Sequence, residues 1–191
     1  MEARLKKIIW SYALLAGMAG LIVAVDQWTK ALVRTNLALG EIWSPWPWLT
    51  PYARIVNWNN TGAAFGMLQG FSGVFTVLAI IVALVIIYYF PRVPAQDWVL
   101  RIAMGFQLGG ALGNLVDRVT MGRVTDFISV GSFAVFNVAD SSITIGVIIL
   151  VLGVWFKEQH DKKEEKALSA TQSASASGNE HPAQGEGDHL E

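Results

Sequence analysis

The stretch that decides the fold runs from Phe71 to Phe90 and reads FSGVFTVLAIIVALVIIYYF. It contains no charged residue and is followed by Pro91. An α-helix rises about 1.5 Å per residue, so a helix of this length spans the roughly 30 Å hydrocarbon core of a bilayer. This run therefore predicts a helix that crosses a membrane.

Three further apolar runs accompany it. Ile8 to Val25 is uncharged, Trp98 to Val116 is interrupted only by Arg101, and Phe133 to Phe156 contains only Asp140. Of the 191 residues, 53% are hydrophobic and only 15% are charged, against about 25% charged in soluble domains. The sequence therefore predicts a membrane all-α protein with four transmembrane helices, and it argues against a soluble enzyme.

The flanking charges predict the orientation of the four spans. Lys and Arg concentrate in cytoplasmic segments. With the N-terminus inside, the inner segments hold nine of these residues and the outer segments five, so we expect both termini in the cytoplasm. The basic residues before Ile8 also fit a cleaved signal peptide, but the run exceeds a usual signal-peptide core and passes straight into Asp26.

The predicted outer segments carry the signs of a small sheet. Tyr52 to Trp58 alternates in side-chain type, which predicts a short strand, and a second short strand is expected through Arg123 to Val130 in a small extracytoplasmic β-sheet. Residues 31–70 also include the sequence WSPWPW at positions 43–48. Its prolines and tryptophans favour an irregular interfacial segment on the lipid headgroups.

Composition changes after the last apolar run. We expect residues 1–156 to form the four-helix membrane domain. Residues 157–191 begin with mixed charges and become rich in Ser, Ala, Gly, Glu and Gln, which predicts a cytoplasmic tail that starts as a helix extension and becomes disordered. The chain has no cysteine, which excludes disulfides and thiolate chemistry, and its net charge of −1 does not indicate nucleic-acid binding.

Four aspartates need an explanation, because a charge at the edge of a bilayer usually faces a cavity or a partner. Asp26 follows the first run, Asp117 follows the third, Asp140 lies near the start of the fourth, and Asp126 lies in the loop between them. In the predicted topology all four reach the outer face. A carrier or channel lined by three of them is one interpretation, although a carrier would place such groups nearer the midplane, often in repeated halves.

Asp126 and Asp140 suggest a specific chemistry. Two carboxylates brought together share a proton, because one ionised group raises the pKa of the other. One can then activate water as a general base while the other, protonated, polarises a scissile carbonyl. This is the requirement for aspartic protease chemistry, although the spacing alone does not show that the pair meets.

Several polar residues have both a structural and a functional interpretation. Asp26 and Lys30 are four residues apart on a helix and can form an ion pair. Asn114 and Arg118 also share a helix face, where they could bind carbonyl oxygens or bridge helices. Asn60 either belongs to a tight turn or presents its amide to an extended ligand.

Three glycines in the third span recur every four residues. Gly105, Gly109 and Gly113 therefore line one helix face and permit close approach of another helix. Packing is their first interpretation. A scaffold that binds other helices through this face is a further alternative, but it leaves the aspartates unexplained.

Five ordered blocks carry a family resemblance. They are DQWTK at 26–30, NTGAAF at 60–65, GGALGNLVDR at 109–118, VTDF at 124–127 and FNVAD at 136–140. With these blocks, residues 8–156 resemble lipoprotein signal peptidase, also called signal peptidase II, a bacterial membrane aspartyl endopeptidase. The resemblance implies four helices, a small sheet and an interfacial helix in the cytoplasmic membrane, with the active site at its outer face.

The resemblance also implies a reaction and its residues. The expected reaction is cleavage of prolipoproteins immediately before a diacylglyceryl-modified cysteine. Asp126 and Asp140 are implied as the catalytic dyad, and Asp117 as a structural residue. The residues implied to support the dyad or bind substrate are Asp26, Lys30, Asn60, Gly109, Asn114, Arg118 and Asn137.

No metal or cofactor is expected, since all three histidines, His160, His181 and His189, lie in the tail. The expected partners are lipid-modified prolipoproteins and membrane lipids, without nucleic acid, and we expect a monomer.

Overall fold

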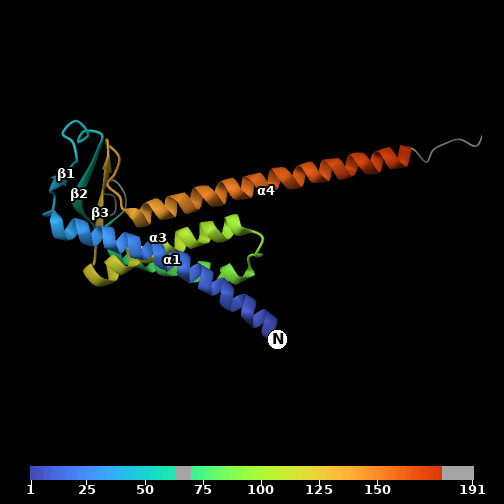
Figure 1. Ribbon diagram of the computed structural model, residues 1–191, viewed down its shortest axis with the longest axis horizontal. Helices are drawn as coiled ribbons and strands as arrows, with labels where there is room; N and C mark the ends of the chain where they lie inside the picture. Colours follow the sequence, from blue (N-terminus) through green and yellow to red (C-terminus); the bar gives the residue numbers. More distant parts are fainter. Residues whose placement is uncertain (63–69, 178–191) are drawn as a thin grey trace, which may run out of the picture. The chain divides into compact units, whose positions relative to one another are not determined.

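The computed structural model describes residues 1–62 and 70–177. This part of the chain contains four long helices and three strands (Figure 1). In chain order the elements are α1 (Glu2–Asn36), β1 (Ile42–Trp43), β2 (Ala53–Asn60), α2 (Ser72–Tyr89), the 3₁₀ helix η2 (Phe90–Arg92), α3 (Trp98–Met121), β3 (Val124–Val130) and α4 (Val138–Ser177).

All four predicted spans are confirmed, because α1, α2, α3 and α4 are each long and apolar enough to cross a membrane. Half of the most apolar stretch of α3 is buried within the protein, compared with 11% for α1 and 17% for α2 and α4. Large apolar side chains on the other helices, such as Leu21, Ile81 and Ile148, are exposed. The central helix is therefore α3, and the others turn apolar surface outward, as expected for side chains that face lipid.

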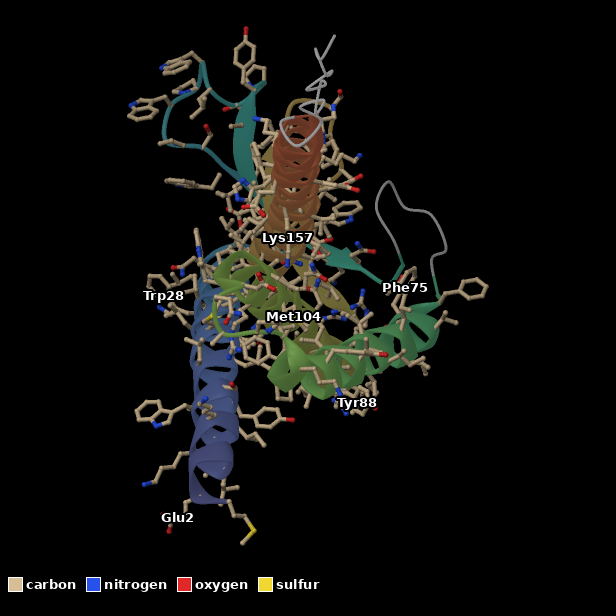
Figure 2. The ribbon with its side chains drawn as sticks, turned by 90° about the vertical axis from the view of Figure 1, so that its right-hand side faces the viewer. Glu2, Trp28, Phe75, Tyr88, Met104 and Lys157 are labelled. Carbon is tan, nitrogen blue, oxygen red and sulfur yellow. The ribbon has the colours of Figure 1, made fainter. Side chains whose placement is uncertain are left out.

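The apolar core lies where α1, α2 and α3 meet, and Met104 of α3 lies between α1 and α2 (Figure 2). The glycine face of α3 lies against α1. A Cβ added at Gly109 would come within 2.7 Å of the Ile22 side chain, and one at Gly105 within 2.5 Å of Met18. At Gly109 the contact is with the branched Cβ of Ile22, so a side chain there requires α1 or α3 to move, and the predicted packing role of the glycine face is confirmed.

A three-stranded antiparallel sheet in the order β1-β2-β3 lies at the C-terminal end of α1, far along that helix from the N-terminus (Figure 1). Strands β2 and β3 confirm the two predicted strands. Their register sets Asn60 opposite Val124 and Trp58 opposite Asp126. The pairing therefore brings Asn60 and Asp126, which are far apart in sequence, to neighbouring positions on the sheet.

Two boundaries differ from the sequence-based expectation. The first apolar run ends at Val25, and Asp26 and Lys30 were expected at the end of its helix, but α1 continues to Asn36. The fourth span was expected from Phe133, but α4 begins at Val138. The reason is that Phe136 pairs with β3: its N–H donates to the Ile128 carbonyl at 3.0 Å, and the Ile128 N–H donates back at 2.7 Å.

Two further segments complete the comparison. Residues 45–52 form bends and turns, and the interfacial helix that the family resemblance implies is not formed in this segment. The mixed-charge stretch after residue 156 continues α4 as a helix, which includes an ion pair of 2.7 Å between Lys162 and Glu158. The chain forms two units, Met1–Val151 and Leu152–Glu191. The expected disordered tail beyond Ser177 lies outside the described residues, and a domain boundary at residue 156 stays a prediction.

Candidate active site

Asp140 is fixed by the way in which α4 begins. The Asn137 side-chain oxygen accepts a hydrogen bond from the Asp140 backbone N–H at 2.9 Å, and the Asn137 backbone N–H donates to Asp140 Oδ2 at 3.2 Å. This reciprocal pair is a capping box, which holds the carboxylate at the helix N-terminus. The helix macrodipole favours a negative charge there. The other carboxylate oxygen, Oδ1, accepts from Asn114 Nδ2 at 2.7 Å.

Asp126 approaches the same place from β3. Its side chain is buried, and Asn137 Nδ2 donates to its Oδ1 at 2.7 Å. Asn60 Nδ2 donates to its Oδ2 at 2.8 Å from the end of β2. Asn137 therefore donates to both carboxylates, to Asp126 through its side-chain amide and to Asp140 through its backbone N–H. The two aspartates that were predicted from the sequence to form a pair are both hydrogen-bonded to one asparagine.

The surroundings of Asp126 favour its protonated form. Burial is the largest cause and, together with the charge of Asp140, it raises the pKa of Asp126 to about 7, although hydrogen bonds from Asn60 and Asn137 act in the opposite direction. A carboxyl group with this pKa exchanges its proton near neutral pH. This property suits a group that must hold and transfer a proton during a reaction.

A buried ion pair lies beside the two carboxylates. Lys30 Nζ is 2.8 Å from Asp26 Oδ2 and 3.3 Å from Asp117 Oδ2, and all three side chains are almost fully buried. Lys30 also donates to Asn114 Oδ1 at 3.0 Å. Because the Asn114 oxygen faces this ammonium group, the Asn114 amide nitrogen faces Asp140. Asn114 therefore connects Lys30 of the ion pair to Asp140 of the candidate dyad.

Asp26 and Asp117 hold the helices and the sheet in place. Asp26 Oδ1 accepts from the Ala139 backbone N–H at 2.9 Å, which connects α1 to the first turn of α4. Asp117 Oδ2 accepts from the Thr125 backbone N–H at 2.9 Å, beside Asp126 in β3. These contacts agree with the structural role implied for Asp117. They also give Asp26 a positioning role that does not require contact with substrate.

Two contributing residues were not identified from the sequence. Gln27 donates to Asp26, to Asp117 and to the Gly113 carbonyl. Arg34 donates to Thr125 Oγ1 at 3.1 Å. Arg34 lies on α1 one turn beyond Lys30, so the continuation of this helix past Lys30 was the missing information. The spacing Asn-x-x-Asp at 137–140 could have indicated the capping box.

A cavity of about 570 Å³ opens at the two carboxylates. Asp126, Asp140, Asn60, Asn114 and Arg118 line it, together with apolar side chains from α2, α4 and the segment before α4. The Arg118 guanidinium carbon lies 5.5 Å from the centroid of a phenylalanine ring of α2. In the described part of the chain, Arg118 forms no hydrogen bond to either carboxylate, so its donors remain available to a ligand.

The remaining site predictions fall outside this cavity. Gly109 packs against α1 rather than lining the cavity. Asp26 and Asp117 do not line it either, which weighs against a carrier whose path is lined by Asp26, Asp117 and Asp140. Residues 63–65 of the block NTGAAF lie outside the described residues. No group of three or more His, Asp or Glu side chains that could hold a metal ion occurs in residues 1–62 and 70–177.

The geometry can perform one recognisable chemistry. Two carboxyl groups share an asparagine, and they line a cavity whose other polar side chains are two amides, one guanidinium and the hydroxyls of Ser141 and Thr144. One carboxyl group has a pKa near neutrality. An acid and a base placed together in this way can activate water and protonate a leaving amine.

Comparison with known proteins identifies the family of this chain. The model of the signal peptidase (SPase) II family matches residues 18–156. The lipoprotein signal peptidase of Shouchella clausii is 40% identical over 150 residues, which cover 78% of this chain and 97% of that protein. The lipoprotein signal peptidase of Geobacillus thermodenitrificans is 41% identical over 152 residues, with 78% and 93% covered.

A solved structure supports the fold independently. It is described as a bacterial membrane enzyme determined by the in meso method at 2.3 Å resolution. It aligns with a TM-score of 0.72 and 33% identity over 80% of this chain and 93% of that one. The matched residues 18–156 include both aspartates of the cavity, the buried ion pair, the second and third spans and most of the first and fourth. The chain is therefore a multi-pass membrane protein that belongs to the signal peptidase II family.

Proposed function

We propose that this protein is a membrane aspartic endopeptidase that removes signal peptides from diacylglyceryl-modified prolipoproteins, cutting before the lipidated cysteine, with Asp126 and Asp140 as its catalytic pair. The observation that carries the proposal is the convergence of both carboxylates on Asn137 at one cavity. Membership of a family of signal peptidases supports the substrate class.

The two carboxyl groups have unequal surroundings, which suggests their roles. Asp126, with its pKa raised to about 7 by burial, holds the proton. Asp140, at the N-terminus of α4 and hydrogen-bonded by a backbone N–H and by Asn114, holds the charge. Asp140 then takes a proton from water as this water attacks the scissile carbonyl. Asp126 donates its proton to the carbonyl oxygen, which gives a gem-diol. Asp140 then returns its proton to the nitrogen, the C–N bond breaks, and Asp126 regains a proton from a hydroxyl of the gem-diol as the carboxyl product forms.

The neighbouring amides and cations position this pair and the substrate. Asn60, Asn114 and Asn137 donate directly to a dyad carboxylate. Lys30 orients Asn114, and Arg118 binds a substrate carbonyl from the cavity wall. Gly109 contributes through helix packing.

The location of the site relative to the membrane is part of the proposal. With the positive-inside rule, both termini lie in the cytoplasm, and the sheet and dyad lie at the outer face of the bacterial cytoplasmic membrane. The chain has no cysteine, so single cysteines at Ser44, Ser132 and Ser173 report position without background. We expect an impermeant thiol reagent to label the first two in intact cells and the third only after lysis. Labelling of the Ser173 site in intact cells would contradict this orientation.

A substrate comparison tests the activity itself. The purified full-length protein, working as a monomer in lipid vesicles, should cleave a diacylglyceryl-modified prolipoprotein and leave the same precursor with an unmodified cysteine intact. Mass spectrometry of the product should show the lipidated cysteine as its first residue. Equal cleavage of both precursors, or a cut elsewhere, would refute the proposed specificity.

A further inference from the structure

A second cavity lies along α3 below the candidate dyad. It has a volume of about 250 Å³ and is lined by residues of α2, α3 and α4. Asn114, Arg118 and Asp140 line both this cavity and the larger one, so the two are adjacent at the dyad. The remaining lining residues are apolar, with the single exception of Gln107.

Gln107 carries an unused hydrogen-bond donor. Its side-chain nitrogen, Nε2, is buried and has no hydrogen-bond partner within residues 1–62 and 70–177. A buried amide donor without a partner is costly, and in native proteins it usually has an identifiable reason. The Gln107 side chain packs closely against α4 at Gly146. A Cβ at Gly146 would come within 2.9 Å of Gln107 Cγ, so glycine at this position allows the close contact.

The position of Gln107 on α3 determines its distance from the dyad. Gln107, Ala111, Asn114 and Arg118 all line this cavity, and their spacing of three or four residues places them on one face of α3. Seven residues separate Gln107 from Asn114, so their Cα atoms are roughly 10 Å apart along the helix. Asn114 donates to Asp140, and Gln107 is therefore about this far below the point of cleavage.

This length matches the lipid group of the substrate proposed above. Seven bonds connect the cysteine nitrogen, which is the leaving amine, to the carbonyl carbon of the nearer ester of a diacylglyceryl thioether. Extended, they reach roughly 9 Å. We propose that the cavity along α3 receives this part of the lipid and that the side-chain amide of Gln107, which lines the cavity, turns about its last bond so that the now buried Nε2 donates a hydrogen bond to an ester carbonyl. Gln107 is then a residue that recognises the ester linkage of the substrate.

The proposal rests on the proposed function, and the nature of the ligand provides its test. A prolipoprotein whose glycerol carries two ether-linked chains keeps the shape of the lipid but lacks both carbonyl oxygens. In single-turnover assays with vesicles, the unaltered protein should cleave the ester substrate with a kcat/KM about 3- to 20-fold higher than the ether substrate, the range that one hydrogen bond within a membrane can supply.

Gln107→Leu should abolish this preference, because leucine fills the space without a donor. Its kcat/KM should be the same for both substrates and equal to that of the unaltered protein on the ether substrate. Ser142→Ala is the matched control, since Ser142 Oγ donates to the Phe106 carbonyl between the same two helices without lining the cavity. This variant should keep the ester preference.

The outcomes separate this proposal from the activity on which it rests. Cleavage of the ester and ether substrates at equal rates by the unaltered protein would overturn the role of Gln107 while leaving the peptidase activity intact. Retention of the preference in Gln107→Leu would overturn it too. If leucine prevents folding, Gln107→Met gives the same comparison with an unbranched side chain. Cleavage of neither substrate would instead refute the proposed function.

Discussion

Replacing Lys30 with methionine should uncouple the ion pair from the dyad. The side chain of Lys30 is fully buried between Asp26 and Asp117 and donates to Asn114, at 2.8, 3.3 and 3.0 Å. Methionine keeps most of the volume but leaves two buried carboxylates without this cation. Removal of one partner of a buried ion pair costs about 3 to 5 kcal/mol. We expect the lower end, because Gln27 and Arg34 still contact Asp117.

The effect on activity should exceed what unfolding explains. Lys30 holds the oxygen of Asn114 and so keeps its nitrogen toward Asp140. A hydrogen bond to a charged group contributes about 1.5 to 3 kcal/mol, which corresponds to a loss of roughly 10- to 150-fold in single-turnover cleavage if all of it is transmitted to the transition state. The exposed lysine variant Lys162→Met serves as a control and should change neither stability nor cleavage.

A double-mutant cycle tests the route of this effect. If Lys30 acts through Asn114, then Lys30→Met should cause little further loss of cleavage in an Asn114→Ala protein. Thermal unfolding in detergent, measured on the same four proteins, identifies any contribution from instability. Losses that multiply in the double variant would refute the idea that Lys30 acts by orienting Asn114.

Three other variants probe separate parts of the site. The value of kcat/KM should fall as pH rises through about 7, where Asp126 loses its proton. Asn60→Ala should move this fall to higher pH, because it removes a hydrogen bond that lowers the pKa of Asp126. A fall at the same pH in this variant would show that Asp126 is not the group that titrates. Arg118→Ala should raise KM with little change in melting temperature. If the melting temperature instead falls in proportion to the loss of cleavage, Arg118 has a structural role. Gly109→Val should destabilise the fold by about 1 to 3 kcal/mol through contact with Ile22, and a normal melting temperature would contradict close packing there.

The features that the sequence predicted share a physical basis. The four spans follow from length and apolarity, and the glycine face of α3 follows from the helical period, so both could be read locally. The residues Asp126 and Asp140 could be singled out because carboxylates at span edges are costly. In each case the information lies in a few neighbouring residues.

Features that depend on contacts between distant segments could not be predicted. That Asn60 faces Asp126 depends on the register of β2 and β3. Asp26 reaches the first turn of α4 only because α1 continues past Val25 and packs against α3. The start of α4 at Val138 depends on the pairing of Phe136 with β3, which competes with extension of an otherwise apolar helix. Gln107 gave no signal because a glutamine within an apolar run is noticeable only once its neighbours are known.

The central claim is that Asp126 and Asp140 act as one catalytic pair, and single-turnover cleavage of a diacylglyceryl-modified prolipoprotein by carboxylate-to-amide variants tests it most directly. Asp126→Asn and Asp140→Asn should each lose at least the 10²- to 10⁴-fold expected for loss of a general acid or base, and the double variant should lose little more than either. Glu41→Gln, an exposed carboxylate outside the cavity, should cleave normally. Near-normal cleavage by either Asp126→Asn or Asp140→Asn would contradict the account.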